Sequence, residues 1–250
     1  MAKVFSKLFR QHILKDWGSR SKINNVEKYL LDTYLTDSSL SVLEAGTGGG
    51  VMSFYLENEK KFKTLTAFDI IPEMILKAQT TAKSQNSNIH FFEGDACDLS
   101  TLQTGQFDYF IYLQQILCMI PQTHLKKALQ EAYRLGAPDS IYLFSFLDWD
   151  SRWYNPILSF NVNAFRFFKG LPFQKYYLPE VKFHGSINWR FYSKNQHALL
   201  WAKKDDLVHL LKSSGFTIES FYKKETLAHI KDNAHYFVCK KRILASTYSN

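Results

Sequence analysis

The stretch Val42-Leu43-Glu44-Ala45-Gly46-Thr47-Gly48-Gly49-Gly50 decides how this chain of 250 residues can fold. A short apolar run, which predicts a buried strand, ends in an acidic residue and is followed at once by a glycine-rich turn. The apolar residues 51–56 then predict the start of a helix. Strand, glycine-rich turn and helix in this order are typical of a nucleotide-type cofactor site in an α/β sheet. Glycine lets the backbone turn tightly and lets a ligand approach the main chain.

The spacing of the glycines separates two kinds of cofactor. A dinucleotide site needs a small residue where this chain has Val51, and a Walker loop needs a Gly-Lys-Ser/Thr that does not follow. The spacing that fits is Gly46-x-Gly48-x-Gly50, with Glu44 two residues before the first glycine. This pattern resembles motif I, E/D-x-G-x-G-x-G, of the class I S-adenosylmethionine (SAM) methyltransferases. A plain glycine-rich turn in a Rossmann-like sheet is the alternative that motif I alone leaves open.

A second predicted strand, residues 64–69, ends in Asp69. An acid placed about 20 residues after the glycine-rich strand is expected to bind a ribose, because a carboxylate accepts hydrogen bonds from both ribose hydroxyls. Ile70 follows and is placed to pack against an adenine ring. Pro72 suits the first turn of a helix that continues over residues 73–83.

Two further landmarks follow in the order that the family has them. Residues 88–96 predict a third strand and a turn, in which Asp95 and Ala96 match positions that face the adenine in class I methyltransferases. The next strand resembles motif IV and ends at Leu113 and Gln114. All these residues lie at carboxyl ends of strands, where open α/β sheets bind their ligands.

The resemblance covers about residues 20–146, and more loosely residues 203–242. It implies an α/β fold: a Rossmann-like, seven-stranded, mostly parallel sheet with helices on both faces and an aromatic-rich insert after strand five. Residues 135–140 depart from the Leu-Lys-Pro-Gly-Gly that the family often has before strand five, which puts only the local turn in doubt. We expect four segments: an N-terminal helical segment (1–36), the SAM-binding core (37–146), a substrate-cap insert (147–201) and the C-terminal part of the core sheet (202–250).

The insert holds 15 aromatic residues, including four of the five tryptophans, and seven basic residues against three acidic ones. Residues 155–169 predict a helix, which should end at residues 170–172. Residues 186–192 predict a strand. A long insert at the cofactor end of a sheet suits a lid or substrate pocket, and its aromatic faces suit an apolar, aromatic or cationic acceptor. For any single ring, filling a small core is the simpler role.

The N-terminal residues 4–17 have apolar residues at three- and four-residue steps, which predicts an amphipathic helix. A membrane-surface helix, a transit peptide and a helix that packs over the cofactor all fit this pattern, and the last is favoured because the chain runs on without a linker. Arg20 follows and is placed to pair with the SAM carboxylate.

Composition limits the classes of partner and of compartment that fit this chain. The net charge is +8, but the lysines are scattered in pairs, so nucleic acid is a less favoured partner than a small molecule. No apolar run is long enough for a spanning helix, and the start lacks the apolar core of a secretory signal. The cysteines form no CxxC pair, which predicts neither a disulfide framework nor a zinc site and fits a cytoplasmic location. They are Cys97, Cys118 and Cys239.

Methyl transfer from SAM is a displacement at a sulfonium carbon, so a general base is needed only for a protonated nucleophile. The weak candidates for a base are His184 and Tyr192 in the insert, and Tyr112 or Gln114 near the fourth strand. No Asn/Asp-Pro-Pro-Tyr/Phe motif of amide and exocyclic-amine methylases is present, nor is a metal cluster expected.

These features predict an enzyme that methylates an O, N, S or C atom of a small-molecule acceptor. Three alternatives stay open: an RNA or protein methyltransferase, a SAM-binding protein without turnover, and, last, a nicotinamide-dependent reductase. The sequence does not decide the oligomeric state.

Overall fold

The computed structural model describes residue 14 and residues 22–179, 181–183, 186–187, 198–223 and 233–241. Apart from residue 14, the predicted N-terminal amphipathic helix lies outside the described residues. So does most of the strand that was predicted over residues 186–192.

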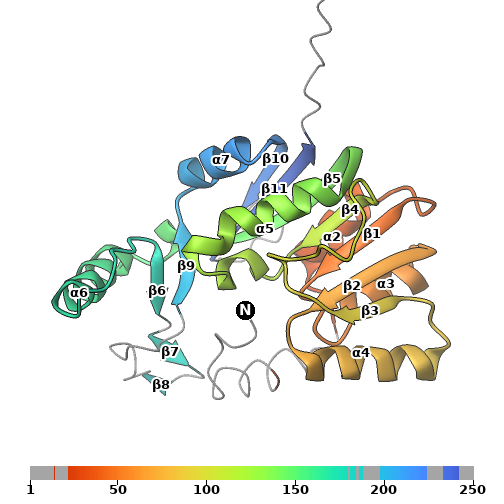
Figure 1. Ribbon diagram of the computed structural model, residues 1–250, viewed down its shortest axis with the longest axis horizontal. Coiled ribbons are helices and arrows are strands. Elements are labelled where there is room, and N and C mark those ends of the chain that lie inside the picture. Colours follow the sequence, from red (N-terminus) through yellow and green to blue (C-terminus); the bar gives the residue numbers. More distant parts are fainter. Residues whose placement is uncertain are drawn as a thin grey trace, which may run out of the picture.

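The main sheet has the order β10-β11-β5-β4-β1-β2-β3, and only β11 runs antiparallel to its neighbours (Figure 1). This confirms the predicted Rossmann-like sheet. The strands are β1 (Ser41–Ala45), β2 (Thr64–Asp69), β3 (His90–Glu93), β4 (Phe107–Tyr112), β5 (Gly136–Asp148), β10 (Phe216–Lys223) and β11 (Ala234–Lys241).

Helices cover both faces of this sheet, as predicted. One buried cluster joins α2 (Asn25–Tyr34), α3 (Val51–Asn58) and α4 (Pro72–Gln85) to one face. The other joins α5 (Gln122–Leu135) and α7 (Lys204–Ser213) to the opposite face. Alternate residues of β4 belong to the two clusters, because successive side chains of a strand point to opposite faces.

The segment that departs from the family pattern differs from the expected turn. Helix α5 ends at Leu135, and β5 begins at once at Gly136, inside the segment that was expected to form a turn before strand five. Phe107 pairs with Gly136 but Tyr109 pairs with Ile141, so β5 carries extra residues in an irregularity inside the strand. A Cβ on Gly136 would lie 1.8 Å from the hydroxyl of Tyr142, so this close approach needs a glycine.

The insert is joined to the core sheet. Its last strand, β9 (Ala198–Ala202), pairs in parallel with the end of β5 through Leu147 and Trp201, and antiparallel with β6 (Tyr177–Pro179). These two strands raise the sheet to nine strands. The predicted helix is present as α6 (Asn155–Phe168), and a small hairpin follows in β7 (Lys182–Phe183) and β8 (Ser186–Ile187). Two short 3-10 helices, η2 (Ile116–Met119) and η3 (Trp149–Ser151), complete the described elements.

A separate small core holds the insert together. Trp149 and Trp201 are buried there, packed with Leu158, Val162 and Leu178. The guanidinium of Arg152 lies 3.6 Å from the centre of the Trp201 ring, as in a cation–π contact.

The three cysteines are buried and unpaired. Burial raises the pKa of Cys118 to about 12. Within the described ranges, no helix has the length and apolar character needed to cross a membrane. The same part of the chain holds no group of three or more His, Cys, Asp or Glu side chains arranged to bind a metal.

Candidate active site

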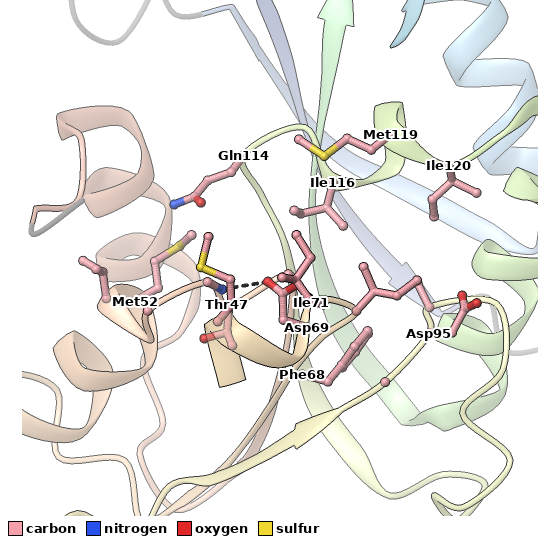
Figure 2. Close-up of a pocket in the computed structure, with 18 residues that line it drawn as sticks. Thr47, Met52, Phe68, Asp69, Ile71, Asp95, Gln114, Ile116, Met119 and Ile120 are labelled. Atoms are coloured by element: carbon pink, nitrogen blue, oxygen red, sulfur yellow. Dashed lines mark hydrogen bonds between the residues drawn. The ribbon is translucent and has the colours of Figure 1, made fainter. Parts of the chain in front are cut away.

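A cavity lies at the carboxyl ends of the parallel strands, where the sequence places the cofactor (Figure 2). Four loops form its wall: the glycine-rich turn after β1, the end of β2, the turn after β3 and the turn between β4 and η2. Of the residues predicted to bind the cofactor, seven line this cavity: Gly46, Gly48, Asp69, Ile70, Asp95, Ala96 and Gln114.

The glycine-rich turn is built by left-handed backbone. Gly46, Gly48 and Gly50 have φ of 65°, 55° and 85°, a region that favours glycine. A Cβ on Gly46 would lie 2.2 Å from Ile116 Cδ1, whereas a Cβ on Gly48 would meet nothing within 4 Å. The turn therefore packs against η2 at Gly46 and leaves open space at Gly48, on the wall of the cavity.

Asp69 is the carboxylate around which the cavity is arranged. Its Oδ2 accepts a hydrogen bond of 2.9 Å from the backbone N–H of Gly48, and its Oδ1 accepts one of 2.9 Å from that of Ile71. Burial raises the pKa of Asp69, and these backbone donors oppose that effect. Each oxygen keeps further acceptor capacity, so the side chain is fixed in place and still able to bind a ligand.

Glu44 belongs to the support of the turn and does not line the cavity. Its carboxylate is buried and accepts a hydrogen bond from the hydroxyl of Ser53 in α3. Burial raises the pKa of Glu44 to about 7, although the hydrogen bond from Ser53 acts in the opposite direction. Glu44 thus links the end of β1 to the helix that follows the turn.

Asp95 and Gln114 enter the cavity from opposite parts of its wall (Figure 2). Asp95 is held by its own turn, where its Oδ1 accepts a hydrogen bond of 2.9 Å from the N–H of Cys97. Gln114 and Gln115 both have φ of 58°, so two consecutive non-glycine residues are left-handed. The N–H of Gln115 donates to the buried hydroxyl of Ser145 on β5, at 2.8 Å, which fixes this turn.

Two predicted site residues lie elsewhere. Leu113 packs in the core on the side of α2, α3 and α4 and is absent from the cavity wall. Tyr112 was wrong as a candidate base: its side chain is fully buried in the opposite core cluster, and burial raises its pKa far above neutrality. The alternation of β4 turns Tyr112 away from the cavity that begins only at Gln114.

Apart from Ile70, sequence reasoning missed the apolar side chains of the wall. Three of the four methionines line the cavity, together with Phe68, Ile71, Ile116 and Ile120. Met52 and Met74 follow closely after the ends of predicted strands, and this position could have predicted that they line the cavity. Met119 lies in η2, which no pattern in the sequence predicts. The remaining predicted residues, Arg20, His184 and Tyr192, lie outside the described residues.

Comparisons with known proteins agree with this geometry. A family described as "Methyltransferase domain" matches residues 42–139. The demethylmenaquinone methyltransferase of Leptospira interrogans is 29% identical over 223 residues, which cover 85% of this chain and 82% of that protein.

Solved structures share the fold. A SAM-dependent methyltransferase of Methanosarcina mazei superposes with a TM-score of 0.63 at 19% identity, covering 90% of this chain and 100% of that one. The 1,6-didemethyltoxoflavin-N1-methyltransferase of Burkholderia thailandensis superposes with a TM-score of 0.65 at 16% identity, covering 97% of this chain and 88% of that one. The match to a methyltransferase domain over residues 42–139, the sheet order and the glycine-rich cavity together make this chain similar to the class I, Rossmann-like, SAM-dependent methyltransferases.

Proposed function

We propose that the cavity binds SAM through the residues described above, and that the enzyme transfers the methyl group to an O, N, S or C atom of a small-molecule acceptor. The observation that carries this proposal is the Asp69 carboxylate. It is buried, fixed by two backbone N–H groups and part of the wall of the cavity that the glycine-rich turn borders.

The cavity suits this cofactor in shape and in chemistry. Gly48 leaves the backbone bare where a Cβ would project into free space, so a ligand can approach the main chain. Most of the wall is apolar, and its carboxylates come from separate strand ends, which suits an adenosine with a polar sugar and a flat base.

In this proposal each residue binds one part of the cofactor. Asp69 accepts hydrogen bonds from the ribose hydroxyls, and Ile70 packs on the adenine. Asp95 and the backbone of Ala96 bind the edge of the adenine. The methionine part lies along Gly46 and Gly48, with Gln114 beside it. Arg20, which is proposed from the sequence alone, pairs with the SAM carboxylate.

SAM supplies a methyl group that is already activated by the positive charge on sulfur. The chain therefore contributes mainly by positioning and by excluding water, and alignment of two reactants can lower a barrier by several kcal/mol, roughly 7–11 in well-oriented cases. The apolar side chains of Met52, Met119 and Ile120 are part of the cavity wall and would help to exclude water from a bound cofactor. His184 and Tyr192 stay the candidates for a base if the acceptor arrives protonated.

A small apolar or aromatic acceptor fits best. The Leptospira relative is named for a demethylmenaquinone, and the Burkholderia structure contains 1,6-didemethyltoxoflavin, so both names refer to small molecules. The aromatic insert at the cofactor end of the sheet supports the same class of acceptor.

The test is calorimetric titration of the purified chain with SAM, S-adenosylhomocysteine and NADH in parallel. We expect binding of the first two and none of NADH. Asp69→Ala should weaken SAM binding by about tenfold or more, because the ribose hydroxyls lose a buried charged acceptor. Asp205→Ala removes an exposed acid from the first turn of α7 and serves as the matched control, with unchanged affinity.

Thermal unfolding establishes whether Asp69→Ala is folded before its affinity is compared. Wild-type affinity in a folded Asp69→Ala protein would contradict the site, and binding of NADH alone would contradict the cofactor. Tight SAM binding without turnover of any quinone, phenol, amine or thiol would instead favour an RNA or protein acceptor, or a SAM-binding protein without turnover.

A further inference from the structure

Helix α6 of the insert carries large apolar side chains on its outer face as well as on the inner face that packs in the core of the insert. Large apolar side chains on one face are exposed to solvent: Ile157 by 57%, Phe160 by 75%, Phe167 by 78% and Phe168 by 83%. Their spacing of three, seven and one residues places them on a single side of the helix. A surface helix of a globular protein normally turns such a face to the core.

The inner face of α6 is held by polar side chains. Asn155 Nδ2 donates to the carbonyl of Trp149 at 2.8 Å, and Ser159 Oγ donates to that of Lys175 at 2.8 Å. Asn163 Oδ1 accepts from the N–H of Gln174 at 2.8 Å. All three side chains are buried, so these hydrogen bonds fix which face of the helix points outward.

The charge around this face has one sign. Residues 151–179 contain no acidic residue, and their basic residues are Arg152, Arg166, Lys169 and Lys175. Lys169 and Lys175 are exposed beside the apolar face. Trp153 adds an indole that is 81% exposed next to the start of α6. Figure 1 shows α6 at one extremity of the molecule, beyond β9 and β6 and away from the main sheet.

We propose that the exposed face of α6 docks on an anionic lipid surface, with its phenylalanines inserted at the headgroup boundary and its lysines paired with lipid phosphates. An apolar helix face with tryptophan and flanking basic residues is the pattern of an interfacial helix. A second copy of the chain is a poorer occupant, because a two-fold contact would bring the same basic patch against itself. This docking goes beyond the proposed methyl transfer and does not depend on it.

The experiment is co-sedimentation of the full chain with vesicles of phosphatidylcholine alone or with phosphatidylglycerol added. We expect binding to the mixed vesicles that weakens as salt rises, since anionic lipid attracts basic residues over about a Debye length. The triple variant Phe160→Ser, Phe167→Ser, Phe168→Ser should bind the mixed vesicles at least about tenfold more weakly than the wild type, because it loses the apolar area that enters the interface. Lys169→Glu should also weaken binding.

Leu76→Ser is the matched control, because Leu76 is an apolar side chain of α4 that is 66% exposed far from α6 along the chain. It should bind like the wild type. Wild-type binding by the triple variant would overturn the proposal and place any lipid contact elsewhere, as on residues 4–17. No binding of the wild type to mixed vesicles would also overturn it. So would a wild-type dimer in sedimentation velocity that the triple variant converts to monomer.

Discussion

Glu44 shows at the scale of one residue why a match to a sequence motif does not by itself assign a role to each residue in it. Its position before the glycines predicts a cofactor contact, yet its carboxylate is buried behind the turn and bound by Ser53. Burial raises the pKa of this carboxyl from 4.5 to about 7. The native state therefore keeps a proton that the unfolded chain releases at a lower pH.

This difference predicts how stability changes with pH. Between pH 5 and pH 7.5 the free energy of unfolding should fall as the pH rises, by up to about 3 kcal/mol from Glu44, because the folded state must ionise a buried group. Glu44→Gln should lose this part of the slope. Urea unfolding of both proteins across this pH range measures it. Parallel curves for the two proteins would show that Glu44 does not titrate in this range.

Side-chain direction limited the other residue predictions. Asp69, Asp95 and Gln114 were predicted to face the site and do line the cavity, because each lies where a strand has ended and its loop begins. Tyr112 and Leu113 are adjacent in sequence to Gln114 but belong to opposite faces of the sheet. A pattern gives the strand, but the residue at which the chain leaves the sheet fixes which side chains face the cavity.

At the scale of elements, the turn from β4 to η2 carries the most strain near the site. Gln114 and Gln115 are both left-handed, and a hydrogen bond from the N–H of Gln115 to Ser145 holds them. The strain of each non-glycine residue is on the order of 1 kcal/mol. The hydrogen bond to β5 therefore offsets part of the cost of this backbone conformation.

Ser145→Ala should destabilise the protein by about 1–3 kcal/mol, because it leaves the N–H of Gln115 without its acceptor. It should also weaken SAM binding, since Gln114 is part of the cavity wall. The matched variant is Ser140→Ala, another buried serine of β5, whose hydroxyl donates to Tyr142 at 2.9 Å. Ser140→Ala should lower the free energy of unfolding but leave the affinity for SAM unchanged. Urea unfolding and calorimetry separate the two effects, and equal SAM affinities would contradict the role of Ser145.

Elements with strong periodicity were predicted within a few residues. Helix α6 and strand β2 lie close to their predicted ranges. The start of β5 was misplaced, because the Gly136–Ser140 segment was taken for a turn on account of its glycine and proline. In the structure this segment is an irregular stretch of strand, which pairing with β4 at Phe107 holds in place. Such pairing depends on the neighbouring strand, so the local sequence of residues 136–140 does not predict it.

At the scale of the whole molecule, the insert extends the sheet through β9 and β6. Trp201 is fully buried in the strand that pairs with the end of β5, and Arg152 stacks on its ring. Trp153, from the same insert, is almost entirely exposed. The sequence predicted an aromatic insert but did not separate these two tryptophans, because their burial depends on the distant contact with β5.

Trp201→Ala should therefore destabilise the protein by about 3–5 kcal/mol, since it leaves a large cavity between the insert and the sheet. Trp153→Ala should change the free energy of unfolding by less than about 0.5 kcal/mol. Urea unfolding of the two variants beside the wild type measures both effects. A small effect of Trp201→Ala would mean that the insert and the sheet unfold independently.

The contact between Gly46 and Ile116 restricts how this lineage can diverge. A methyl group at position 46 would overlap the end of the isoleucine side chain, so Gly46 cannot gain a side chain while Ile116 keeps its size. A relative that carries alanine at position 46 should carry a smaller side chain at position 116, acquired first. The two positions, 70 residues apart in the chain, should covary in an alignment of homologues.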